Sequence, residues 1–131
     1  MISLFKKYPF ILLFGVLQII FTAPGQTFLI SLFITPIFSD LNLSLSLFAG
    51  LYSTATLLAA LLLNPMGQLI DKLSLNKVLF AMILLMAIGC FLLASATNIW
   101  SVGIAFFLLR FIGQGGFGLA ATQLSLKPLK K

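Results

Sequence analysis

Residues 78–109 read VLFAMILLMAIGCFLLASATNIWSVGIAFFLL, with no charged side chain anywhere in the run. Residues 8–39 and 41–70 form two further charge-free runs, and another apolar run follows Arg110 as far as Leu126. Crossing the hydrocarbon core of a bilayer takes about 20 mostly apolar helical residues, because the core is about 30 Å thick. The three charge-free runs are longer than this, so the chain has several segments that can span a membrane.

The composition points to an integral membrane protein and excludes other classes. Hydrophobic residues make up 61% of the 131 residues and charged residues 8%, whereas soluble domains carry about 25% charge. A soluble enzyme, a disordered tail and a disulfide-rich domain are therefore excluded. The chain has no histidine or glutamate and a single cysteine, Cys90. We expect no enzyme activity, no metal and no cofactor. The net charge of +6 comes from short lysine clusters without a basic face, so nucleic acid is not an expected partner.

The charge-free runs predict an all-α membrane domain of four helices within residues 1–131. Pro24 should kink the first helix, and the polar cluster at residues 95–98 should separate the third from the fourth. Asn42 or Ser44 is expected to cap the second helix, and Asn98 the fourth. The expected spans are approximately residues 9–36, 43–69, 77–96 and 99–124.

The lysines set the expected orientation. With four helices, all seven lysines fall at the termini or between helices two and three, on one side of the membrane. The positive-inside rule makes that side cytoplasmic, together with both termini. The apolar character continues past Pro24, so a cleaved signal peptide is not expected. The chain is thus predicted to be a multi-pass protein of the cell (inner) membrane.

The expected connection between helices two and three reads GQLIDKLSLNK at residues 67–77. It resembles the signature loop of the major facilitator superfamily, G-x-L-x-D-[RK]-x-G-[RK]-[RK]. Ser74 stands where the pattern has glycine, and two uncharged residues interrupt its basic run. Gly67 should allow close backbone approach, and Asp71 should meet a helix N-terminus or a cation. The alternative is a plain solvated loop. The residues that match the loop motif are Gly67, Leu69, Asp71, Lys72 and Lys77.

A second motif reads RFIGQGGFG at residues 110–118, inside the fourth expected helix. It resembles the R-x-x-x-Q-G form of the superfamily's fourth-helix motif. Arg110 would lie near the bilayer centre, where an arginine costs about 2.5–3.5 kcal/mol, and should face the bundle interior or a water-filled cavity. The glycines predict either tight helix packing or a hinge. They are Gly113, Gly115, Gly116 and Gly118.

Helix one carries PGQT at residues 24–27, a break followed by two hydrogen-bonding side chains. In the family that the motifs resemble, helices one and four are equivalent in an inverted repeat and line the transport cavity. The resemblance therefore makes Gln26, Thr27, Arg110 and Gln114 candidates for substrate binding or coupling, with Gly25 as a packing residue. Hydrogen bonding between helices is the alternative role. The two segments look most like the branch of monocarboxylate and other organic-anion carriers, which implies a small-molecule substrate such as an organic anion.

The resemblance implies secondary active transport of small solutes by alternating access. Carriers of this superfamily have about twelve helices in two halves, and these four correspond to the first four. We therefore expect a truncated N-terminal fragment that is inactive alone and whose partners are the bilayer and the remainder of the carrier. The alternative is a small four-helix membrane protein that acts as an oligomer or an interaction scaffold.

Overall fold

The computed structural model describes the backbone of residues 6–126 and the side chains of residues 6–123. Every regular element in this part of the chain is helical. Four helical spans are long and apolar enough to cross a membrane, as the sequence predicts. The elements are α2 (Pro9–Thr22), η1 (Ala23–Gly25), α3 (Thr27–Leu41), α4 (Leu45–Lys72), α5 (Leu75–Ala94), α6 (Ile99–Leu108), η2 (Leu109–Gly116) and α7 (Phe117–Leu126).

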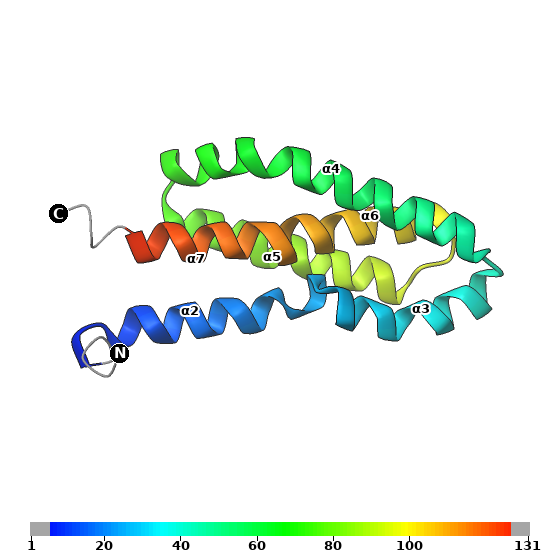
Figure 1. Ribbon diagram of the computed structural model, residues 1–131, viewed down its shortest axis with the longest axis horizontal. Coiled ribbons are helices and arrows are strands. Elements are labelled where there is room, and N and C mark those ends of the chain that lie inside the picture. The colour runs from blue at the N-terminus through cyan, green and yellow to red at the C-terminus, as the bar shows by residue number, and fades with distance from the viewer. Residues whose placement is uncertain (1–5, 127–131) are drawn as a thin grey trace.

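The four spans run alternately up and down (Figure 1). The first span consists of α2, η1 and α3, and the fourth of α6, η2 and α7. The start of α2, the α4–α5 connection and the end of α7 lie at one end of the bundle, and the α3–α4 and α5–α6 connections lie at the other (Figure 1). Lys72 ends α4 and Lys77 lies in the first turn of α5, so both lie at the end of the bundle where α2 begins. Lys127, Lys130 and Lys131 fall outside the described residues.

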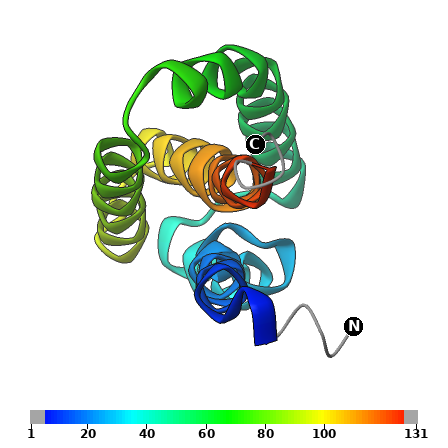
Figure 2. The same cartoon turned by 90° about the vertical axis from the view of Figure 1, so that its left-hand side faces the viewer.

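The fourth span is the centre of the bundle. It lies between the other three in the end-on view and packs against each of them (Figure 2). Half of its most apolar window is buried, against 11% for the first span. Ile112 and Phe117 lie in a buried cluster with α5, and Phe106 lies in a second cluster with α3 and α4. Because this span contacts all the others, its side chains determine how the four spans pack together.

The helix ends differ from the prediction by a few residues. Pro36 was expected to end the first helix, but α3 continues through it to Leu41 and ends at Asn42, which adopts the left-handed conformation (φ 50°). Ser44, rather than Asn42, caps α4 by accepting a hydrogen bond from the Leu47 N–H at 3.2 Å. Asn98 caps α6 as predicted, because its Oδ1 accepts from the Ser101 N–H at 3.0 Å.

Candidate functional site

The first span is interrupted at Pro24. Proline has no N–H and cannot continue the hydrogen-bond ladder of α2. The chain forms the short 3-10 turn η1, and Gln26 is then extended (φ −79°, ψ 147°) before α3 begins at Thr27. The predicted kink is thus a break between two half-helices. No side chain of the described residues caps α3, so its first amide groups and the positive end of its dipole are left available.

The fourth span is wound more loosely where its motif lies. The segment η2 is π-helical, and at its end the Phe117 N–H donates to the Ile112 carbonyl, five residues back. Such wide turns are rare and occur frequently at functional sites. Arg110, Gly113 and Gln114 all lie in this segment. The glycines of this segment predicted either tight packing or a hinge, and neither alternative indicated a π-helix.

The two irregular segments cross at Gly25 and Gly113. A Cβ atom on Gly25 would lie 2.1 Å from the Leu109 carbonyl oxygen and 2.7 Å from the Gly113 Cα. A Cβ on Gly113 would in turn lie 2.7 Å from the Gly25 Cα and 2.8 Å from the Met86 methyl group. Only glycine fits at either position, so the first and fourth spans touch backbone to backbone.

Arg110 lies three residues before this crossing, and its side chain is 7% exposed. Its Nη1 donates to Gln114 Oε1, and its Nη2 donates to the Tyr52 hydroxyl. The guanidinium also lies over the Tyr52 ring, 4.5 Å from the centroid. The Tyr52 hydroxyl donates to Thr27 Oγ1 at 3.3 Å. One chain of hydrogen bonds therefore joins the fourth span, through α4, to the first residue of α3.

The charge of Arg110 has no counter-ion in the described chain. Its buried Nε has no hydrogen-bond partner among the described residues, and none of their carboxylates forms an ion pair with it. The whole sequence contains two acidic residues, Asp40 and Asp71, which lie in the last turns of α3 and α4. A buried guanidinium with an unsatisfied donor carries a desolvation cost that an anion would relieve.

Tyr52 is the site residue that the sequence analysis missed. Its ring stacks on Phe48, with centroids 5.9 Å apart, and meets the edge of Phe106 at 5.8 Å. This aromatic cluster holds the hydroxyl at Arg110. Tyr52 lies on α4 among other polar residues, Ser53, Thr54 and Thr56, so its position in the sequence does not single it out.

A cavity of about 240 Å³ opens between α4 and η2, next to Arg110. Of the predicted candidates, Arg110 and Gln114 line it. Thr27 connects to it through Tyr52, and the half-buried Gln26 side chain makes no hydrogen bond among the described residues. The cavity can hold a small polar or charged molecule beside the guanidinium. Its lining residues are Thr56, Ala59, Ala60, Leu63, Arg110, Gln114 and Gly115.

Of the other three predicted packing glycines, two have close neighbours and one has none. A Cβ on Gly115 would meet the Leu63 side chain at 2.1 Å, and one on Gly116 would meet two methionine methyl groups at 2.8 and 2.9 Å, so both are packing positions. Gly118 is exposed, and a Cβ there would meet nothing within 4 Å. Its predicted packing role is wrong, because it faces away from the neighbouring spans.

The expected connection at residues 67–77 is mostly helical in the structure. Asp71 and Lys72 belong to the last turn of α4 and Lys77 to the first turn of α5, so only Leu73 and Ser74 separate the helices. Asp71 is exposed and pairs with no helix end or cation among the described residues, contrary to expectation. A Cβ on Gly67 would meet nothing within 4 Å, so the expected close backbone approach is also wrong.

No protein-family model, curated protein or solved structure matches the chain. In residues 6–126, no group of three histidine, cysteine, aspartate or glutamate side chains is placed to hold a metal ion. The chemistry that the described site offers is therefore a buried positive charge, hydroxyl and amide groups, and a small cavity.

Proposed function

We propose that these four helices belong to a secondary transporter of the major facilitator type and form part of the wall of its solute cavity. The observation that carries the proposal is the crossing of two interrupted helices at Gly25 and Gly113, next to a buried arginine. Irregular backbone at membrane depth is tolerated only against protein or a water-filled cavity. The two sequence motifs, in their order and on these helices, support the same family.

The solute proposed is a small organic anion. Arg110 supplies one positive charge, and in the adjacent cavity of about 240 Å³ the residues of α4 are apolar except for Thr56. The uncapped N-terminus of α3 adds a positive dipole end at Thr27, which Tyr52 joins to the guanidinium. An anion in the cavity would offset the positive charge of the guanidinium. Binding it would then compete with the Tyr52 and Gln114 contacts of Arg110.

The proposed mechanism is alternating access at the cell membrane. The carrier exposes the cavity first to one side and then to the other as its two halves rock about the site. Asp71, which is exposed at the end of α4, would pair with another cytoplasmic segment and hold that side closed. In this scheme Arg110 binds the solute, and the Tyr52 hydroxyl links Arg110 to Thr27 at the start of α3.

A cysteine-accessibility experiment tests this proposal. In a Cys90→Ala background in proteoliposomes, Gln114→Cys should react with a membrane-impermeant thiol reagent, because a transport cavity contains water. Leu57→Cys is the control on α4, since Leu57 is 66% exposed on the outside of the bundle and should face lipid. Equal, slow reaction at both positions would refute a water-filled cavity and with it the proposed function.

The same proteins test the solute class. Small carboxylates such as benzoate should slow the reaction of Gln114→Cys, and the uncharged amide of the same molecule should not. Adding Arg110→Gln should remove the protection. Equal protection by acid and amide would contradict the anion assignment. It would not affect the conclusion about a water-filled cavity, which depends only on the reactivity of Gln114→Cys.

A further inference from the structure

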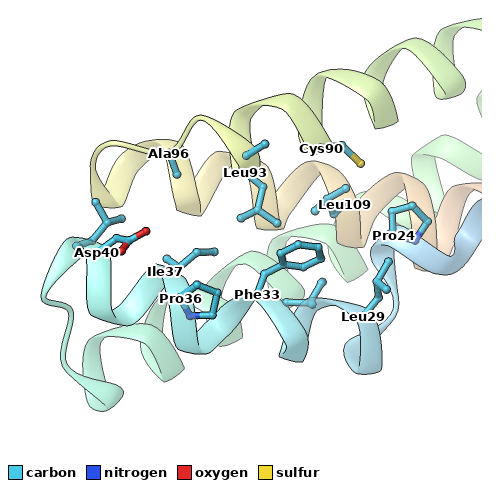
Figure 3. Close-up of a pocket in the computed structure, with 13 residues that line it drawn as sticks. Pro24, Leu29, Phe33, Pro36, Ile37, Asp40, Cys90, Leu93, Ala96 and Leu109 are labelled. Atoms are coloured by element: carbon cyan, nitrogen blue, oxygen red, sulfur yellow. The ribbon is translucent and has the colours of Figure 1, made fainter.

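A groove on the outer side of the bundle runs between α3 and α5 (Figure 3). Its volume is about 430 Å³. Leu29, Phe33 and Ile37 line it from α3, and Cys90 and Leu93 line it from α5. It is separate from the cavity at Arg110, which lies between α4 and η2. The groove has no part in the function proposed above.

The groove has the length of one membrane leaflet. Along α3 it extends from Asp40, at the end of the helix, past Leu29 to Pro24 at the break (Figure 3). The helical stretch from Leu29 to Asp40 rises roughly 16 Å, about half of the ~30 Å hydrocarbon core. One leaflet is one acyl chain deep, so the length of the groove fits a single acyl chain that lies along α3.

The groove is charged only at the end where Asp40 lies. The walls are apolar except for the Cys90 thiol and the carboxylate of Asp40, the one charged lining residue (Figure 3). Asp40 is exposed and has no cationic partner among the described residues. The lysines of α4 and α5 lie at the opposite end of the bundle. A ligand that fits therefore combines an apolar chain with a positively charged group at the membrane surface.

We propose that the groove binds one acyl chain of a phosphatidylethanolamine from the leaflet at the Asp40 end, with its ammonium group on the Asp40 carboxylate. This lipid carries a chain and a primary ammonium group in one molecule. Phosphatidylglycerol presents the same acyl chain with a net negative head, which the carboxylate repels. The Asp40 end of the groove thus selects lipids by the charge of their headgroup, and the apolar walls accept any acyl chain.

Quenching of a single tryptophan by brominated acyl chains tests this lipid site. A Trp100→Phe, Phe33→Trp protein places the fluorophore in the groove, and brominated phosphatidylethanolamine or phosphatidylglycerol is the minor component of otherwise identical bilayers. An exposed ion pair contributes about 0.2–1 kcal/mol, so we expect roughly a 1.4- to fivefold preference for the ethanolamine lipid. Asp40→Asn should remove the preference. Asp71→Asn, which changes the other acidic residue of the chain, should leave it intact.

A second fluorophore position separates the groove from the general lipid shell. Phe91 is 71% exposed on α5 next to Cys90 but does not line the groove, so Phe91→Trp should be quenched equally by the two lipids. Equal quenching at Phe33→Trp, or a preference that survives Asp40→Asn, would overturn the proposal. Quenching at Phe91→Trp but not at Phe33→Trp would overturn it too, because the groove would then be filled by protein.

Discussion

Replacing Gly25 by alanine places a methyl group where the first and fourth spans touch. Its Cβ would lie 2.1 Å from the Leu109 carbonyl oxygen and 2.7 Å from the Gly113 Cα, and ordinary contact begins near 3.4 Å. Both neighbours are backbone atoms, which cannot turn aside as a flexible side chain can. The two spans must therefore move apart by more than about 1 Å, and a gap of that size removes a quarter to a half of each dispersion contact across it.

The expected cost is at the upper end of the range for overpacked cores, about 2–3 kcal/mol in the free energy of unfolding. For a chain of this size that corresponds to a melting temperature lower by roughly 6–12 °C. The assay is the loss of the monodisperse size-exclusion peak after heating in detergent, supported by reversible unfolding in SDS. Gly113→Ala should behave similarly, because its Cβ meets the Gly25 backbone. Gly115→Ala should cost less, since the Leu63 side chain that it meets can rotate.

Gly118→Ala is the matched control. It makes the same chemical change on the fourth span, as Gly113→Ala does, but its Cβ meets nothing within 4 Å. Because alanine is the better helix former, the free energy of unfolding of this variant should equal that of the unmodified protein or exceed it by up to about 1 kcal/mol. If Gly25→Ala were as stable as Gly118→Ala, the first and fourth spans would not cross backbone to backbone at Gly25 and Gly113.

Three further substitutions test other contacts by the same unfolding assay. Tyr52→Phe removes the hydroxyl that accepts from Arg110 and should lower stability by about 1.5–3 kcal/mol, and no loss would mean that this hydrogen bond is not formed. Asn98→Ala removes the cap of α6 and should cost about 1 kcal/mol, with reduced helicity by circular dichroism. Phe106→Ala empties a fully buried position between Phe48 and Tyr52 and should cost about 3–5 kcal/mol, and a value below 1 kcal/mol would contradict its place in the core.

Much of the candidate site could be predicted from local pattern. Arg110 and Gln114 are four residues apart, so a helix brings them to one face, and they do form a hydrogen bond. Gly25 and Gly113 could be selected as packing residues because each lies in a segment with a break or several glycines. Tyr52 could not be linked to Arg110 in this way, because the two are 58 positions apart and their contact depends on how α4 lies against η2.

The sequence by itself determined the four spans, the break at Pro24 and the cap at Asn98. These features depend on hydropathy over about 20 residues, on the missing N–H of proline and on a side chain three residues from its partner, all of which are local. Only the tertiary structure decided which glycines touch, that Gly118 faces outward and that Tyr52 holds Arg110. It also decided that α3 and α5 leave a groove between them that ends at Asp40. Each of these depends on the rotation and tilt of whole helices, which are set by packing between residues far apart in the chain.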